Sequence, residues 1–250
     1  MSWQRYRATH VVGDLRVLRG ELDRDLFAWL PPGYDDGERA YPVVYLHDAQ
    51  NLFDVDLSNA GEWRVDETLT MLAAEGIELI AIGLPHAGAL RAHEYVGRGL
   101  DEHVTRLVRR VKLVVDHDFR TTGPTGVGGS SFGAYASLYA WARRPDVFSR
   151  VLVMSPAFFG DRARIFEAVA ATEASDDARI WLDVGGREHE DERYRTEYLN
   201  GHREMTKLLQ GCGFGADGLR SEVHLEAVHH ESAWAERLPE ALRFLFGPQA

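Results

Sequence analysis

Short runs of consecutive apolar residues recur along this chain and constrain its fold more than any other feature. They lie at 42–46, 78–82, 151–154 and 180–182. A strand covered on both faces by other elements has this composition, whereas a strand with one face in water alternates apolar and polar residues. The runs therefore predict a sheet that is buried on both sides.

Longer segments between these runs have helical periodicity. In 100–119 the apolar side chains fall three or four residues apart and form one stripe, made of Leu100, Val104, Leu107, Val108, Val111, Val115 and Phe119. We also expect helices over 131–143, 193–210 and 239–246. Because parallel strands need helical crossovers, the alternation predicts an α/β fold with a mostly parallel central sheet and helices on both faces.

Composition narrows the class of protein further. The 250 residues are 45% hydrophobic, which suits one globular domain spanning 1–250. With 28 basic and 39 acidic residues the net charge is -11, so we expect neither nucleic acid nor an anionic membrane as a partner. The single cysteine, Cys212, cannot form an internal disulfide, and no apolar run is typical of a signal or membrane span. We therefore expect a cytoplasmic location.

A glycine-flanked serine follows the short extended segment 125–127 and begins the 131–143 helix. Ser131 has Gly129 two residues before it and Gly133 two residues after it, whereas Ser130 lacks the second glycine. This is the pattern of a nucleophile elbow, in which a side chain on either neighbour would clash with the strand or helix. A glycine-rich turn with a capping serine is the alternative interpretation.

A serine nucleophile needs a base and an acid, which on this fold follow it in the order acid, then histidine. His229 and His230 stand after the extended segment 221–225, and either could be the base. The acid should follow the 180–182 run. Several carboxylates stand there, and the residues alone do not choose among them: Asp183, Glu188, Glu190, Asp191 and Glu192.

The oxyanion formed during acyl transfer needs two backbone N–H donors. We expect one from Phe132, directly after the serine, and the other from Gln50, in the loop after the first apolar run.

Several segments together resemble the putative esterase group of the α/β-hydrolases, which includes enterochelin esterase, esterase D and feruloyl-esterase-like enzymes. The resemblance rests on segments 45–54, 62–66, 91–95, 129–133, 155–158 and 229–234. It implies an α/β-hydrolase fold, with Ser131 as nucleophile, Glu188 as the acid and His229 as the base. It also supports the N–H groups of Gln50 and Phe132 as the oxyanion hole. The chain departs from the group at Ala49, Ala134 and Val228, where glycine is usual or frequent.

These observations predict a carboxylic ester hydrolase that forms an acyl-enzyme and requires no metal or other cofactor. Side chains that follow the strands are expected to shape the substrate pocket: Arg91, His93, Tyr95 and Phe158. A chain of 250 residues leaves little room for a separate lid domain, so we expect an open pocket that favours small, short-acyl esters.

Two alternatives belong to other classes. One is a non-catalytic binding protein that keeps the hydrolase fold. The other is a metal-dependent phosphoesterase, with its ligands drawn from His47, Asp48, Glu188, His189 and His229.

Overall fold

The computed structural model describes residues 2–20, 22–58, 60–173 and 175–248. In these residues nine strands form one sheet, in the order β1-β2-β3-β5-β4-β6-β7-β8-β9. Their bounds are β1 Gln4–Arg5, β2 Asp14–Leu18, β3 Leu26–Leu30, β4 Tyr41–His47, β5 Ile80–Leu84, β6 Thr121–Ser130, β7 Arg150–Met154, β8 Arg179–Arg187 and β9 Leu219–Val228. The pairs from β1 to β5 along this order are antiparallel, and all pairs from β5 to β9 are parallel. The predicted α/β fold with a mostly parallel sheet is therefore confirmed.

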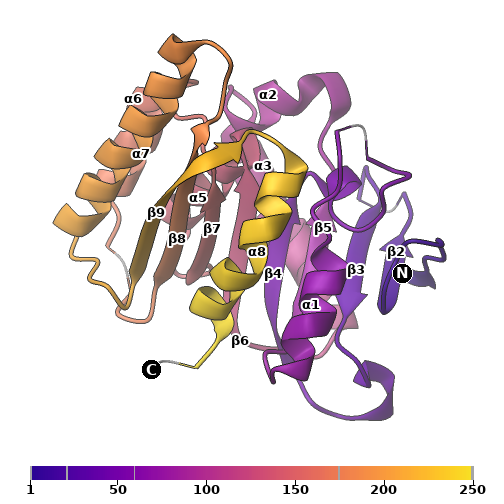
Figure 1. Cartoon of the computed structure of the whole chain (residues 1–250). Coiled ribbons are helices and arrows are strands. Elements are labelled where there is room, and N and C mark those ends of the chain that lie inside the picture. The colour runs from indigo at the N-terminus through magenta and orange to yellow at the C-terminus, as the bar shows by residue number, and fades with distance from the viewer. Residues whose placement is uncertain (1, 21, 59, 174, 249–250) are drawn as a thin grey trace.

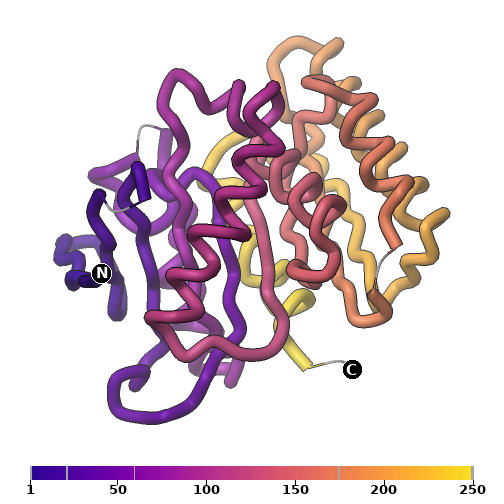
Figure 2. Tube along the Cα trace, turned by 180° about the vertical axis from the view of Figure 1, so that it is seen from behind, coloured from indigo at the N-terminus to yellow at the C-terminus, as the bar shows by residue number. Residues whose placement is uncertain are grey.

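Helices cover both faces of the sheet (Figure 1). On one face α1 (Val65–Ala74) packs beside α8 (Glu231–Phe246) over one cluster of buried apolar side chains. On the other face, seen in Figure 2, lie α3 (Leu100–Arg106), α4 (Lys112–Asp118) and α5 (Phe132–Arg143) over a second cluster. The short α2 (Arg91–Tyr95) contacts α5, and α6 (Arg162–Ala170) packs between α5 and α7 (Glu192–Gly211).

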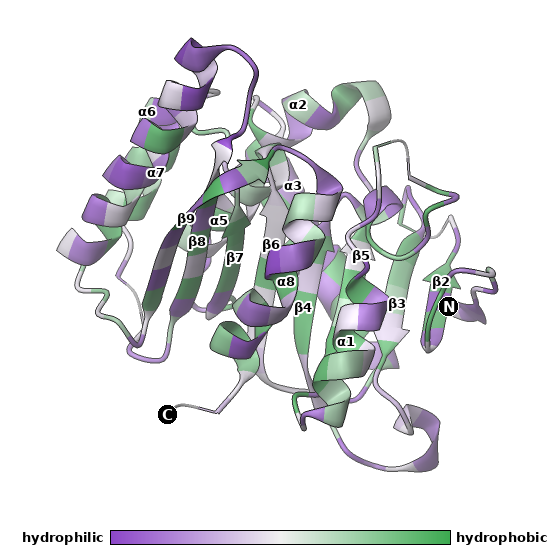
Figure 3. Ribbon diagram, in the orientation of Figure 1, coloured by the Kyte–Doolittle hydropathy of each residue, from purple (hydrophilic) through white to green (hydrophobic). Residues whose placement is uncertain are grey.

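The predicted apolar stripe of 100–119 is confirmed, because all seven of its side chains are buried in the second cluster. The segment is helical from α3 to α4, with one turn of π-helix at Leu107–Val111. Hydropathy follows the layers: Figure 3 shows hydrophobic residues along the central strands and hydrophilic residues over much of α7. Within the described part of the chain, no helix has the length and apolar character needed to cross a membrane.

The expected start of the last helix is wrong. The helix begins at Glu231 instead of Pro239, and Pro239 lies inside it. Proline usually interrupts a helix because it lacks an N–H group and crowds the preceding turn. In α8 the carbonyl of Ala235 loses the hydrogen bond that Pro239 cannot donate. Both residues line the same open hollow at the surface, where water can replace the missing donor.

The parallel strands bring distant segments of the chain to one edge of the sheet. β6 ends at Ser130, which pairs with Met154 of β7, and Met154 in turn pairs with Asp183 of β8. The loops after β4, β6, β8 and β9 leave the sheet at this edge, the upper one in Figure 1. Ligands of open α/β sheets bind at the carboxyl ends of the strands, so this edge is where the site is sought.

Candidate active site

Ser131 occupies the sharp turn between β6 and α5. Its backbone angles are φ 56 and ψ -122, a conformation that residues with a side chain rarely adopt. The Ser131 N–H donates to the carbonyl of Met154 (3.0 Å), and its own carbonyl accepts from the N–H groups of Tyr135 (3.2 Å) and Ala157 (3.3 Å). Hydrogen bonds on both sides of the turn therefore hold the strained backbone that the elbow motif requires.

The flanking glycines are needed for close packing. A Cβ on Gly129 would lie 2.8 Å from the carbonyl carbon of Gly133. A Cβ on Gly133 would lie 3.0 Å from the Asp48 carboxylate and 3.1 Å from the Cβ of His47. Both contacts agree with the clash expected from the sequence.

His229 and Glu188 meet at the same edge of the sheet. His229 follows β9, Glu188 follows β8, and the distance between His229 Nδ1 and Glu188 Oε2 is 2.6 Å. The Glu188 side chain is fully buried, and its other oxygen accepts hydrogen bonds from the Ser155 hydroxyl and the Gly185 N–H, both at 2.5 Å. With the carboxylate on Nδ1, the Nε2 atom of His229 is free to exchange a proton with a substrate or a serine.

The other candidate residues have different environments. His230 is exposed, and its Nδ1 pairs with the hydroxyl of Ser232 (2.9 Å). Asp183 is buried beside the guanidinium of Arg237, at 3.1 Å. The exposed Asp191 accepts a hydrogen bond at the start of α7. Of the residues that the sequence left open, the structure pairs Glu188 with His229.

Two aromatic rings enclose His229. The rings of Tyr198 on α7 and Trp234 on α8 lie 5.2 Å and 5.0 Å from the imidazole, centre to centre. Burial, aided by the charge of Glu188, raises the pKa of the Tyr198 phenol to about 12. Among the described residues, His229 makes its side-chain hydrogen bond to Glu188, and none joins it to the Ser131 hydroxyl. Catalytic hydrogen bonds are often long or unformed in a resting enzyme.

The sequence analysis missed Tyr198 because nothing in the pattern of a long amphipathic helix marks one tyrosine on it. Trp234 was part of the family resemblance, yet its contact with His229 could not be read from sequence spacing.

The two expected oxyanion donors come from a short 3-10 turn and from a helix start. Gln50 lies in the turn Ala49–Asn51 after β4, and Phe132 is the first residue of α5. The N–H groups in the first turn of a helix have no partner within the helix and carry its partial positive charge. The Gln50 side chain bonds to both backbone groups of His86 in the loop after β5 (3.5 and 3.3 Å), which fixes the turn from one side.

Arg91 fixes the same turn from the other side. Its guanidinium makes two parallel hydrogen bonds to the Asp48 carboxylate, at 2.7 and 2.8 Å, and lies 5.5 Å from the centre of the Phe132 ring. Asp48 itself has a left-handed backbone (φ 61), directly before the turn. Arg91 therefore holds the turn that carries Gln50, which is the expected oxyanion loop.

The other three residues expected to bind substrate are buried in the core or packed against a neighbouring residue. Tyr95 and Phe158 are 0% and 2% exposed and belong to the core, so their side chains do not reach a substrate at the surface. His93 is exposed on α2 and packs against Gly99. Bulky aromatic residues are typical of both pockets and cores, and the sequence gives no means of separating the two.

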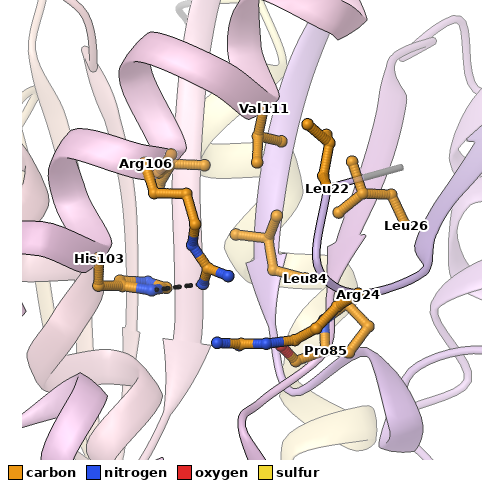
Figure 4. Close-up of a pocket in the computed structure, with 9 residues that line it drawn as sticks. Leu22, Arg24, Leu26, Leu84, Pro85, His103, Arg106 and Val111 are labelled. Carbon is orange, nitrogen blue, oxygen red and sulfur yellow. Dashed lines mark hydrogen bonds between the residues drawn. The ribbon is translucent and has the colours of Figure 1, made fainter. Parts of the chain in front are cut away.

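A small cavity with charged walls lies beside α3, away from Ser131 (Figure 4). Its volume is about 20 Å³, enough for one water molecule and too small for an ester. Arg24 and Arg106 border it, and both donate hydrogen bonds to the Glu94 carboxylate (2.6–2.8 Å). The cavity is therefore a structural void beside an ion pair.

The alternative of a metal-dependent phosphoesterase is not favoured. Its five expected ligands do not gather: the Nε2 atom of His47 lies 2.8 Å from His103 in the core, and His189 packs on Tyr194. Within the described residues, one group has ligand atoms close enough for a metal ion, Glu62 with Asp66 and Glu67, and it contains none of the five.

Known proteins that are similar to this chain show its family and its fold. The model of a protein family described as "Putative esterase" matches residues 21–245. The uncharacterized protein YbbA of Bacillus subtilis (strain 168) is 22% identical over 235 residues, which cover 90% of this chain and 93% of the relative. A solved structure of a ferulic acid esterase is 16% identical with a TM-score of 0.67, over 93% of this chain and 96% of its own. An IroE-like serine hydrolase from Shewanella oneidensis is 18% identical with a TM-score of 0.70, over 98% and 80%. The two structures share the α/β-hydrolase fold of this chain, and the family match over most of its length shows that the protein belongs to the putative esterase family.

Proposed function

We propose that this esterase hydrolyses small carboxylic esters through an acyl-enzyme on Ser131, with His229 as general base and Glu188 as the acid that orients it. The observation that carries the proposal is the 2.6 Å contact between Glu188 and His229 Nδ1, at the sheet edge where Ser131 occupies its strained turn. A buried carboxylate on Nδ1 selects the tautomer whose Nε2 can accept a proton, and it stabilises the imidazolium that forms.

The reaction has two steps. The Ser131 oxygen attacks the ester carbonyl and gives its proton to His229, which passes that proton to the departing alcohol. A water molecule then attacks the acyl-enzyme, His229 accepts its proton, and the carboxylic acid leaves as Ser131 recovers a proton. In both steps the N–H groups of Gln50 and Phe132 stabilise the negative oxygen.

Substrate size and location are part of the proposal. A ferulic acid esterase and an IroE-like serine hydrolase share the fold, which supports ester hydrolysis by a serine. For this chain we expect an open pocket for short acyl groups. The net charge of -11 disfavours nucleic acid as a partner. The free Cys212, which has no second cysteine to pair with, supports a cytoplasmic location.

Hydrolysis of p-nitrophenyl esters tests the proposal. We expect acetate to be cleaved faster than palmitate, and Ser131→Ala, His229→Ala and Glu188→Ala each to lower kcat by roughly 10⁴-fold or more. EDTA should leave the rate unchanged, because no step uses a metal ion. Full activity in Ser131→Ala would contradict the mechanism, and faster turnover of palmitate would contradict the proposed preference for short acyl groups.

A further inference from the structure

We propose that Ser155 is a positioning residue whose hydroxyl hydrogen holds Glu188 in place as the partner of His229. This inference rests on the proposed triad and assigns a second serine to its support. Ser155 lies directly after β7, is 0% exposed, and has the left-handed backbone angle φ 46. Its N–H donates to the carbonyl of Asp183 (2.9 Å), which fixes the serine between β7 and β8.

The direction of the hydroxyl hydrogen follows from its three partners. Trp234 Nε1 lies 2.9 Å and Arg237 Nη2 3.2 Å from the Ser155 oxygen, and both groups can only donate. These two donors use both lone pairs of the hydroxyl. Its single hydrogen must then go to the third partner, Glu188 Oε1, at 2.5 Å.

All hydrogen-bonding capacity of Ser155 is therefore committed, and the hydroxyl has one orientation. Glu188 Oε1 receives two donors, from Ser155 and the Gly185 N–H, and the other oxygen faces His229. Two donors on one oxygen fix the rotation of the carboxyl group. The Ser155 hydroxyl and the Gly185 N–H, which do not reach the substrate, thus fix the carboxylate that orients His229.

Charge balance under the triad points to the same arrangement. Arg237 is 6% exposed and lies 3.1 Å from the fully buried carboxylate of Asp183. Arg237 thus forms its ion pair with Asp183 and not with Glu188. It acts on Glu188 only through its hydrogen bond to the Ser155 hydroxyl. Trp234 connects Ser155 to His229, since its ring packs on His229 while its N–H donates to the Ser155 hydroxyl.

The test compares Ser155→Ala with Ser155→Gly on p-nitrophenyl acetate, in the full chain. Glycine suits the left-handed backbone, so the second variant removes the hydroxyl without strain. We expect kcat to fall roughly 10- to 100-fold, the effect of losing one hydrogen bond to a charged group. KM should change less than about threefold, because His229 serves both the formation and the hydrolysis of the acyl-enzyme and both steps slow together.

A matched control variant and the Glu188→Ala background distinguish a loss of positioning from a loss of folding. Thr172 follows α6, and its hydroxyl donates to the carbonyl of Ala168 (2.8 Å), outside the residues of the site; Thr172→Val should keep kcat within about twofold. In a Glu188→Ala background, removing the Ser155 hydroxyl should cost nothing further, because it acts through Glu188.

Wild-type kcat in both Ser155 variants would overturn the inference. It would also be overturned if removing the Ser155 hydroxyl lowered kcat by the same factor in the wild-type and Glu188→Ala backgrounds. Either result would leave the triad untouched, because the Ser131→Ala and Glu188→Ala variants measure it separately. Full activity in Glu188→Ala would instead contradict both the triad and the role of Ser155.

Discussion

Replacing Gly129 by alanine should disable the turn at Ser131 while leaving the sheet folded. A Cβ at this position would lie 2.8 Å from the carbonyl carbon of Gly133, 3.0 Å from its oxygen and 3.1 Å from its Cα. Carbon atoms in contact pack at about 3.5–4.0 Å, so the first distance is short by about 0.7–1.2 Å. Because the opposing atoms are backbone, no side-chain rotation relieves the clash, and the start of α5 has to move.

That movement determines the expected magnitude. The start of α5 carries Phe132, whose N–H is the proposed oxyanion donor, and a misplacement of about 1 Å at a reacting centre can cost roughly 100-fold in rate. Overpacking of a buried site costs about 1–3 kcal/mol of unfolding free energy. Gly129→Ala should therefore lower kcat about 100-fold, with a modest loss of stability.

The assay pairs kcat for p-nitrophenyl acetate with urea unfolding. Gly37→Ala is the matched control, since a Cβ there has nothing within 4 Å. Its kcat and its free energy of unfolding should both equal those of the wild type. Gly133→Ala should be milder than Gly129→Ala, because its two closest contacts, with the Asp48 carboxylate (3.0 Å) and the Cβ of His47 (3.1 Å), are longer. Wild-type kcat in Gly129→Ala, or an equal loss in Gly37→Ala, would refute the packing argument.

Two further predictions concern charges. Arg91→Met should lower kcat about tenfold with KM unchanged, because it releases Asp48 and the oxyanion loop; a raised KM at constant kcat would show that Arg91 binds substrate instead. Burial, together with the neighbouring Glu67, raises the pKa of Asp66 from 3.8 to about 8. The folded chain thus keeps a proton that the unfolded chain releases, so the free energy of unfolding should fall as the pH rises from about 4 to about 8. Thermal unfolding across this range checks the slope, which Asp66→Asn should flatten; an unchanged slope in that variant would contradict the assignment.

The central sheet was predictable because burial on both faces leaves a strong signal. The runs at 42–46, 151–154 and 180–182 lie within β4, β7 and β8, and the run at 78–82 overlaps β5, which begins at Ile80. Helices α1, α2 and α6 were missed. Their apolar positions, such as Leu69 and Leu72 in α1, stand in short segments where helix and loop patterns differ little.

The site was predictable where chemistry requires a local motif and not where it depends on loop geometry. Ser131 was marked by its glycines. The acid was left open by the residues, because one carboxylate within β8 and four after it cannot be ranked without the path of the loop, and Glu188 entered through the family resemblance. Ser155 entered only as part of the resembling segment 155–158, and Arg237 carried no signal. A buried serine and a helical arginine are ordinary until two contacts are seen, Arg237 with Ser155 and Ser155 with Glu188.

Intact-mass and peptide mass spectrometry after exposure to a fluorophosphonate test the activated serine most directly. The account predicts a single adduct on Ser131 in the wild type, its loss in Ser131→Ala, and its retention in Ser130→Ala, the neighbouring serine that lies inside β6. An adduct on another residue, or labelling that survives in Ser131→Ala, would contradict the assignment of Ser131 as the nucleophile.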